Sequence, residues 1–541
     1  MKQKCLNIFF VALCVALMCG CSKRRGEVEF TIFTTSDIHG KIYPVDYVTG
    51  NDRGGSMMAA ATLLEELRAT NENVLYFDTG DVIMGGGESY YDLTVDIANQ
   101  SLMAMMLDEM ECNAFVPGNH EFDFGMPTID RFIRSGKFPV LCANMTFQGL
   151  DIANSFYQPY TVVVKNKVRI AVLGLTTMSI NYKIPTQFME GMEVVSAVES
   201  AKYWIPYIQK NEKPDVIVCL VHSGYNGGYS DDRISENEAL ALAEQVPGID
   251  MIFYGHDHRM NNRKVVSCTG DSVLLLNPAN NARMAGVTKL TLQFDKRKVV
   301  SKSVSAELVQ LRDKEPNQEL MDKTAEKREL FMGYLDSVMG VTAVDLQYSR
   351  RAYEPSTGMD YVHNILQEIV SAEITMVLPV SGKAVKAGNF TPRDAMLLYP
   401  HENTLISMML TGGEIKAALE EGAKNIRRNP TKVVTAGGLN YTIDMSKPEG
   451  ERVLISSLAD GQKFDVEKMY RVTMDSYLAY ALDSPFITSF NNNRDLLKER
   501  VMLSKNSDVR FNMMINHAIK YDKGKQVEPV RNGEWSLVNY N

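Results

Sequence analysis

The chain has little cysteine outside its N-terminal segment. Four of its eight cysteines lie within the first 21 of 541 residues, and the other four are Cys112, Cys142, Cys219 and Cys268. These four contain no Cys-x-x-Cys pair, so the sequence gives no sign of a thiolate metal site. Cys219 lies within an apolar run and is expected to be a small core residue.

The chain also lacks a surplus of positive charge. It carries 57 Lys and Arg against 66 Asp and Glu, a formal net charge of −9. This balance argues against a generally basic surface that binds nucleic-acid polymers. A small anionic substrate would need local positive charge, which bound metal ions supply well.

The apolar run at the N-terminus, Leu6–Met18, is short for a membrane span. Two lysines precede it, and Gly20 and Cys21 follow, which is typical of an export signal. The sequence Met18-Cys19-Gly20-Cys21 is similar to a bacterial lipobox, with Cys21 as the lipidated first residue. The alternative is an ordinary signal peptide cut nearby. We therefore expect an exported lipoprotein, anchored to a bacterial membrane and facing the periplasm or the cell surface.

The length predicts two large domains rather than one. Hydrophobic residues make up 45% of the chain and charged residues 23%, which is typical of globular proteins. A charged stretch with helical spacing, Glu315–Val338, predicts a connecting helix. The expected divisions are a signal peptide and tether (1–26), a first domain (27–310), a linker helix (311–340) and a second mixed α/β domain (341–541).

Short apolar strands alternate with helical stretches along the first domain, which predicts an α/β class with sheets covered by helices. Helices are expected from Gly54 to about Thr70 and over Thr94–Met110. The expected strands are Glu29–Thr35, Asn73–Phe77, Ala114–Val116, Phe138–Ala143, Val168–Leu175, Asp215–Val221, Asp250–Tyr254, Val273–Leu276 and Val287–Phe294.

Polar side chains recur where these strands end, and they include five of the eight histidines. The blocks are Asp37-x-His39, Gly80-Asp81, Gly118-Asn119-His120, His222 and Gly255-His256-x-His258. Each block alone is common on protein surfaces, but imidazole, carboxylate and amide oxygen together suit Zn, Mn, Fe or Co. The donors outnumber the four ligands of a simple zinc site, so the set predicts two divalent metal ions that share one carboxylate.

These blocks resemble the signature of the calcineurin-like metallophosphoesterases. The longer blocks Gly118–Phe124, Val221–Gly224 and Gly255–His258 are similar to the secreted two-domain family of 5′-nucleotidases and 2′,3′-cyclic-nucleotide 2′-phosphodiesterases. The similarity continues around Leu398–Leu405 and Gly437–Asp444. The resemblance implies a metallophosphoesterase β-sandwich flanked by helices and a C-terminal nucleotide-binding domain.

The resemblance also implies roles for the strand-end residues. Asp37, His39 and His258 would hold one metal, Asn119, His222 and His256 the other, and Asp81 would bridge them. His120, oriented by Asp123, would face the phosphate and stabilise the transition state or protonate the leaving oxygen. Asp78 lies off the motif and is expected to be structural. The implied nucleophile is a hydroxide activated by two metals.

In this family two aromatic rings of the second domain hold the base. Tyr399 and Tyr477 are similar to the sandwich of the cyclic-phosphodiesterase branch, and Asn403 is a further expected substrate contact. Each tyrosine could equally be a core aromatic. The 5′-nucleotidase branch usually has Pro-Phe-Gly-Asn and Gly-Gly-Asp-Gly-Phe at these places, which this chain lacks; Phe486 would be its stacking ring.

The resemblance therefore implies hydrolysis of nucleotide phosphate esters, favouring 2′,3′-cyclic-nucleotide 2′-phosphodiesterase and 3′-nucleotidase activity. The alternative is a 5′-nucleotidase or UDP-sugar hydrolase. A third hypothesis is a nucleotide-binding lipoprotein without turnover, against which the intact set of metal-type residues argues.

Overall fold

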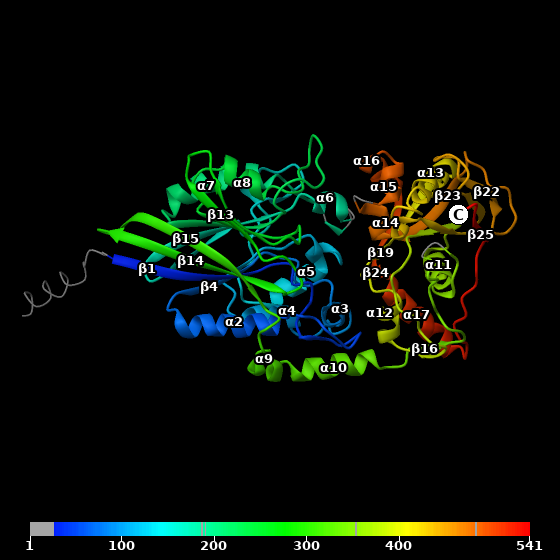
Figure 1. Ribbon diagram of the computed structural model, residues 1–541, viewed down its shortest axis with the longest axis horizontal. Coiled ribbons are helices and arrows are strands. Elements are labelled where there is room, and N and C mark those ends of the chain that lie inside the picture. The colour runs from blue at the N-terminus through cyan, green and yellow to red at the C-terminus, as the bar shows by residue number, and fades with distance from the viewer. Residues whose placement is uncertain (1–25, 185–187, 190, 352–353, 482–483, 541) are drawn as a thin grey trace, which may run out of the picture.

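The computed structural model describes residues 26–184, 188–189, 191–351, 354–481 and 484–540. Two domains lie side by side, and helices α9 (Gln318–Lys323) and α10 (Ala325–Leu335) run along one side between them (Figure 1). The lipobox expected at Cys21 lies outside the described residues. Within the described part of the chain, no helix combines the length and the apolar character that crossing a membrane requires.

The N-terminal domain is a sandwich of two sheets. The first sheet has the order β15-β14-β1-β4-β5 and the second β12-β13-β11-β10-β8-β7. The strands of the first are β1 (Gly26–Thr35), β4 (Val74–Asp78), β5 (Ala114–Phe115), β14 (Met284–Asp295) and β15 (Lys298–Gln310). Those of the second are β7 (Tyr160–Lys165), β8 (Val168–Thr176), β10 (Val216–His222), β11 (Met251–Tyr254), β12 (Asn261–Val266) and β13 (Ser272–Asn277).

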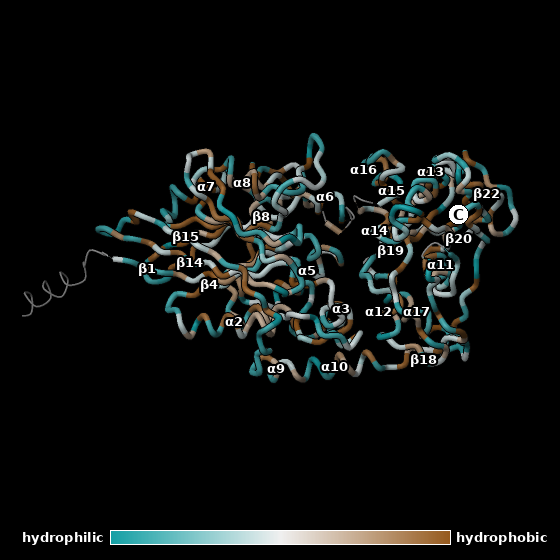
Figure 2. Tube along the Cα trace, in the orientation of Figure 1, coloured by the Kyte–Doolittle hydropathy of each residue, from teal (hydrophilic) through white to brown (hydrophobic). Residues whose placement is uncertain are grey.

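The core of the sandwich lies between the sheets. Phe30 and Phe77 of the first sheet pack in one buried cluster with Val172 and Leu220 of the second. Hydrophobic segments accordingly concentrate in these strands (Figure 2). Strands β1, β4 and β5 run parallel, as do β8, β10, β11 and β13, so their carboxyl ends meet at the same edges of the two sheets.

Helices cover the outer faces of both sheets, which confirms the expected sandwich of sheets flanked by helices. On the first sheet lie α2 (Met57–Thr70), α3 (Gly87–Thr94), α4 (Leu102–Glu109) and α5 (Met126–Ser135); on the second lie α7 (Ala197–Asn211) and α8 (Ala239–Gln245). The shorter elements are β2 (Val45–Asp46), β3 (Asn51–Asp52), η1 (His120–Phe122), β6 (Met145–Phe147), η2 (Ile152–Asn154), α6 (Ile180–Lys183) and β9 (Met192–Val194).

Three elements differ from the sequence prediction. The helix expected over Thr94–Met110 begins only at Leu102. Residues 95–101 form a loop after α3, where the buried Asp92 accepts hydrogen bonds from Ser101 and Leu102. The strand expected over Phe138–Ala143 forms only isolated bridges, because its pairing passes from β5 to Gln158 within two residues. The helix expected over Glu315–Val338 is interrupted at Thr324, where α9 ends and α10 begins.

The C-terminal domain is also mixed α and β. Its main sheet has the order β20-β17-β23-β19-β24, beside a three-stranded sheet β22-β21-β25 and a pair β16-β18. Its strands are β16 (Gly340–Thr342), β17 (Ile374–Val377), β18 (Gly388–Phe390), β19 (Thr404–Thr411), β20 (Thr435–Gly437), β21 (Leu439–Asp444), β22 (Val453–Leu458), β23 (Met469–Asp475), β24 (Val501–Asp508) and β25 (Trp535–Val538). Its helices are α11 (Thr357–Val370), α12 (Pro392–Leu398), α13 (Gly412–Ala423), η4 (Pro430–Lys432), α14 (Ser476–Tyr480), α15 (Pro485–Ser489), α16 (Arg494–Arg500) and α17 (Val509–Asp522).

Candidate dimetal active site

The strand-end residues converge beyond the carboxyl ends of β1, β4, β5, β10 and β11. Five of them adopt positive φ, with 50° at Asp37, 51° at His39, 56° at Asp81, 77° at His256 and 59° at His258. Left-handed backbone at a residue other than glycine costs about 1–3 kcal/mol and persists where the surrounding structure enforces it. The fold thus holds these side chains in place at the expense of local strain.

Asp37, His39, Asp81 and His258 form one group of candidate ligands, whose donor atoms all lie within 4.8 Å of one another. The Nε2 atoms of His39 and His258 are 3.0 Å apart. The Nδ1 of His39 donates to the carbonyl of Met84, so its Nε2 presents a lone pair to the group. Two buried carboxylates and two imidazoles at this spacing form a suitable donor set for a borderline divalent cation.

Asp81, His222 and His256 form a second group that shares Asp81 with the first. The Nδ1 of His222 donates to the carbonyl of Thr79, so Nε2 of the neutral ring is an acceptor, and it faces Asp81 Oδ2 at 3.1 Å. Two acceptors at this distance require a cation or a proton between them. Burial lowers the pKa of His222, but the Asp81 carboxylate outweighs it and raises the pKa to about 9.

Asn119 provides a second sign that the group is incomplete without a cation. Its Oδ1 is buried and has no hydrogen-bond partner among the described residues, and its side chain lines the cavity beside the site. A buried polar atom without a partner costs about 1–3 kcal/mol. Two divalent metal ions therefore fit the residues present, with Asp81 at the junction of the two groups.

His120 lies outside both groups. It begins η1, and its Nδ1 donates to Asp123 Oδ2 at 2.6 Å, while its backbone N–H donates to Asp81 Oδ1 at 2.8 Å. Its side chain is 32% exposed. Burial lowers the pKa of His120, but Asp123 and Asp81 outweigh it and raise the pKa to about 10. The structure thus brings His120 to the edge of the site with its orientation held by Asp123.

Glu121 has a role that the sequence analysis missed. Its carboxylate accepts backbone N–H groups from Asp81 at 2.8 Å, Val82 at 2.7 Å and Gly118 at 2.5 Å. It therefore binds the loop that carries Asp81 to the loop that carries Asn119. The position of Glu121 within the block Gly118-Asn119-His120-Glu121 was the sequence feature that could have indicated this role.

Asp78 accepts a hydrogen bond from Gly80 N–H and another from Thr35, so its contacts are those of a structural residue.

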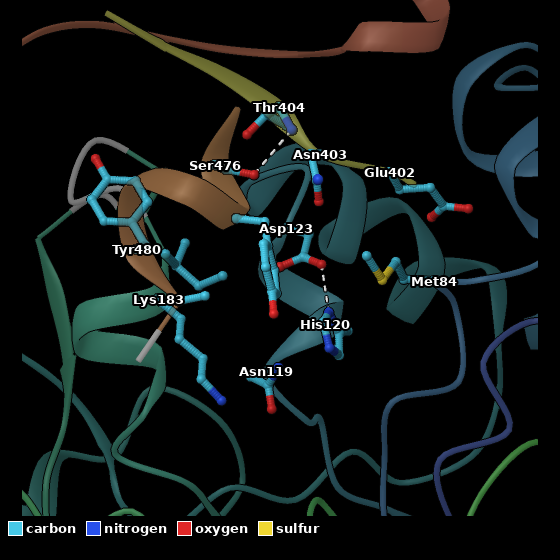
Figure 3. A pocket seen from close by; sticks show the side chains of 13 residues that line it. Met84, Asn119, His120, Asp123, Lys183, Glu402, Asn403, Thr404, Ser476 and Tyr480 are labelled. Atoms are coloured by element: carbon cyan, nitrogen blue, oxygen red, sulfur yellow. Dashed lines mark hydrogen bonds and ion pairs between the residues drawn. The ribbon is translucent and has the colours of Figure 1, made fainter. Parts of the chain in front are cut away.

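A cavity of about 210 Å³ lies where this site faces the C-terminal domain (Figure 3). The N-terminal domain contributes Met84, Asn119, His120, Asp123, Lys183 and Ile184. The C-terminal domain contributes Glu402, Asn403, Thr404, Ser476, Tyr477, Tyr480 and Ala481. Of the four predicted substrate contacts, Asn403 and Tyr477 lie in this lining.

The other two predicted contacts require correction. Tyr399 is 1% exposed, and its hydroxyl donates to Asp475 Oδ2 at 3.1 Å. Asp475 also caps α14 through Leu478 N–H, so the Tyr399 ring is fixed in the core and presents no face to the cavity. Phe486 is 0% exposed and packs in the core of the same domain. A second aromatic ring in the cavity lining, which the sequence did not predict, is Tyr480, one turn of α14 after Tyr477.

A two-sheet sandwich with a shared carboxylate between two histidine-rich groups defines a metal-dependent phosphoesterase. Residues 30–260 match the family described as calcineurin-like phosphoesterase, and residues 338–491 match the 5′-nucleotidase C-terminal domain. The chain belongs to the calcineurin-like phosphoesterases that carry a 5′-nucleotidase C-terminal domain.

Known proteins of similar sequence and structure agree with this assignment. The chain is 25% identical to the trifunctional nucleotide phosphoesterase protein YfkN of Bacillus subtilis, with 84% of this chain but only 32% of that protein covered. It is 25% identical to a 2′,3′-cyclic-nucleotide 2′-phosphodiesterase/3′-nucleotidase of Haemophilus influenzae, with 86% and 82% covered. The crystal structure of a 5′-nucleotidase precursor from Thermus thermophilus has the same fold, with a TM-score of 0.60, 22% identity, and 95% of this chain and 100% of that chain covered.

Proposed function

We propose that the protein hydrolyses phosphate esters of nucleotides outside the cytoplasm, favouring 2′,3′-cyclic-nucleotide 2′-phosphodiesterase and 3′-nucleotidase chemistry. The observation that carries this proposal is the cavity between the domains. One wall holds Asn119, His120 and Asp123 beside the candidate metal ligands, and the other holds Asn403 and Tyr477. A phosphate ester can therefore lie against the metal site while its base contacts the C-terminal domain.

Two divalent ions, of Zn, Mn, Co or Fe, complete the proposed site. Asp37, His39 and His258 would hold one, Asn119, His222 and His256 the other, and Asp81 both. When bound, the two ions would acidify a water molecule and neutralise charge on the phosphate.

The protein's own residues supply orientation and proton transfer. Glu121 joins the Asp81 loop to the Asn119 loop by accepting backbone N–H groups from Asp81, Val82 and Gly118. Asp123 accepts the Nδ1 proton of His120, which leaves Nε2 as the ring atom available to a substrate. From the cavity wall, His120 can donate a hydrogen bond to the phosphate or a proton to the leaving oxygen.

A 5′-nucleotidase or UDP-sugar hydrolase is the second candidate. The match of residues 338–491 to the 5′-nucleotidase C-terminal domain supports it. The burial of Phe486, the ring expected to stack under this alternative, argues against it.

An assay of phosphate release from a panel of nucleotides distinguishes the candidate functions. The mature chain is incubated with 2′,3′-cyclic AMP, 3′-AMP, 5′-AMP and UDP-glucose, in Mn²⁺ or Co²⁺ and in a chelator. We expect metal-dependent release of adenosine and phosphate from the first two substrates. Preference for 5′-AMP would favour the second candidate. Nucleotide binding without turnover under every metal condition would make the protein a binding lipoprotein.

We also propose that Cys21 carries a lipid that anchors the protein to a bacterial membrane, on the periplasmic or outer face. The lipobox-like sequence before Cys21 supports this. In cells grown with a labelled fatty acid, the wild-type protein should take up label and sediment with membranes. Cys21→Ala should abolish both, and unchanged labelling in that variant would contradict the anchor.

A further inference from the structure

Lys183 is the last residue of α6, and it is the one Lys or Arg side chain that lines the cavity among the residues described by the structure. Its side chain is 27% exposed and extends from the same side of the cavity as Asn119 (Figure 3). Asp123 and Glu402 also line the cavity. Without Lys183, the protein would present two carboxylates and one imidazole to an incoming phosphate.

The ammonium of Lys183 is held in position by a buried carboxylate. Its Nζ lies 2.9 Å from Glu236 Oε1, and the side chain of Glu236 is only 7% exposed. The other carboxylate oxygen of Glu236 accepts the backbone N–H of Tyr229 at 2.7 Å. An ammonium has three N–H donors, and the bond to Glu236 uses one of them. The positive charge is thus fixed at the cavity wall with donors left for a ligand.

Glu236 also links Lys183 to the candidate metal site. The same oxygen, Oε1, accepts a hydrogen bond from His256 Nε2 at 3.0 Å. This bond leaves His256 Nδ1 as the acceptor atom of the neutral ring. Lys183 therefore faces the cavity and also contacts Glu236, which orients the predicted metal ligand His256. An experiment must separate the effects of these two contacts.

We propose that Lys183 binds the phosphate group of the substrate, its ammonium donating hydrogen bonds to the non-bridging oxygens beside His120. This inference deepens the proposed function and rests on it. A lysine ammonium acts on phosphate as a point charge, so the attraction grows with the charge on the phosphate. A dianionic monoester, such as a 3′-nucleotide, gains more from Lys183 than a monoanionic cyclic diester does. Lys183 thus favours the nucleotidase step over the phosphodiesterase step.

The test compares a dianionic and a monoanionic substrate that lack a nucleobase, p-nitrophenyl phosphate and bis-p-nitrophenyl phosphate, at pH 8 with saturating Mn²⁺. Lys183→Met removes the charge and keeps the length. We expect kcat/KM for the monoester to fall roughly 10- to 100-fold, the effect of losing a hydrogen bond to a charged group. The fall for the diester should be clearly smaller, and Lys183→Arg should restore most of both activities.

The matched control is Lys202→Met, which makes the same change in net charge at a lysine on α7 that pairs with Glu199 and is 42% exposed. It should leave both activities unchanged. Calorimetric titration with Mn²⁺ should give equal affinities for the wild type and Lys183→Met. An equal fall for both substrates with weakened Mn²⁺ binding would overturn the proposal, because Lys183 would then act through Glu236 and His256. Unchanged kinetics would also overturn it.

Direct binding of inorganic phosphate separates this inference from the proposed function. If the wild type hydrolyses neither substrate, the proposed function fails, but phosphate titration of the Mn²⁺-loaded protein still tests Lys183. Weaker phosphate binding by Lys183→Met than by the wild type and Lys202→Met supports the inference. Equal binding by all three proteins overturns it.

Discussion

Asp81 is the residue on which both metal groups depend. It is 1% exposed and belongs to each group, and its two oxygens contact His120 N–H and His222 Nε2. His120, in contrast, lies outside both groups and lines the cavity. The proposed roles of holding metal and transferring a proton therefore fall on separate side chains.

Substitution should separate these two tasks. Asp81→Asn should lose nearly all turnover together with bound metal, because both groups lose their shared carboxylate. His120→Ala should keep its metal and lose turnover by about 10²–10⁴-fold, as expected for a general acid. Phosphate release and elemental analysis of the purified variants measure the two effects.

Asp130→Asn, a change at an exposed position of α5, serves as the control and should match the wild type. Metal loss in His120→Ala would make His120 a ligand and contradict the division of roles. Full activity in a folded Asp81→Asn protein would contradict the dimetal site.

Tyr477 and Tyr399 form a matched pair of residues for testing which tyrosine contacts the substrate. Tyr477 is 42% exposed at the cavity, whereas Tyr399 is buried. Tyr477→Ala should raise KM for nucleotides, since stacking on a base contributes roughly 1–3 kcal/mol. It should change hydrolysis of bis-p-nitrophenyl phosphate much less, because that substrate has no base. Steady-state kinetics with both substrates measure this difference.

Tyr399→Phe keeps the ring and removes its hydrogen bond to Asp475. The Tyr399 hydroxyl also accepts a hydrogen bond from Asn403 Nδ2 at 3.2 Å. We expect the variant to lower stability by about 1 kcal/mol and to raise the nucleotide KM much less than Tyr477→Ala does. A rise in KM for Tyr399→Phe with no rise for Tyr477→Ala would restore Tyr399 as the substrate contact.

At the scale of elements, α11 is attached to the C-terminal sheet through a buried histidine. His363 is 7% exposed, and its ring nitrogens contact Thr375 Oγ1 at 2.8 Å and Thr435 Oγ1 at 3.2 Å. Thr375 lies on β17 and Thr435 on β20. Burial lowers the pKa of His363 to about 4. The helix is therefore packed on the sheet with a neutral imidazole.

This histidine predicts a loss of stability in acid. The unfolded chain binds a proton at His363 near pH 6.5, whereas the folded chain binds it only near pH 4, so stability falls as pH decreases between these values. From pH 7 to pH 5 the loss through His363 should be about 2 kcal/mol. His363→Gln should be less stable at pH 7 but should lose less stability on acidification. Urea unfolding at both pH values tests this, and equal losses in the two proteins would contradict it.

At the scale of the whole molecule, the cavity exists because the two domains are packed together. Tyr90 of α3 donates to Asp508 Oδ1 at 3.2 Å, and the Arg510 guanidinium lies 4.1 Å from the centre of its ring. Arg510 pairs with Glu402 at 3.2 Å, and Glu402 accepts the N–H of Gly85 at 3.2 Å. These contacts join the N-terminal domain to the wall that carries Asn403.

Loosening this contact should affect large substrates most. Tyr90→Ala removes both the hydrogen bond and the ring under Arg510. We expect kcat/KM to fall several-fold more for nucleotides than for p-nitrophenyl phosphate, because only a nucleotide spans both walls. Tyr90→Phe keeps the ring and should have a smaller effect. Equal falls for both substrates would show that the contact serves stability rather than substrate binding.

Much of the site was predictable because its candidate metal ligands lie in short sequence blocks that directly follow predicted strands. The Asp-x-His and His-x-His blocks directly follow strand ends, and parallel strands bring such ends to a common edge. The spacing of Asp37, His39, His256 and His258 therefore predicted a metal cluster, and the alternation of strands and helices predicted the sandwich. The orienting contact of Asp123 with His120 was equally local, three residues away.

Other features depended on contacts between distant parts of the chain. Tyr399 and Tyr477 were both expected to contact the base. Tyr399 is buried with its hydroxyl bonded to Asp475, whereas Tyr477 is exposed and lines the cavity. Lys183 and Glu236 lie 53 residues apart, and nothing in either segment indicates the pair. Sequence by itself determined which residues can hold metal. Tertiary structure decided which residues face the substrate, because burial depends on what packs against each side chain.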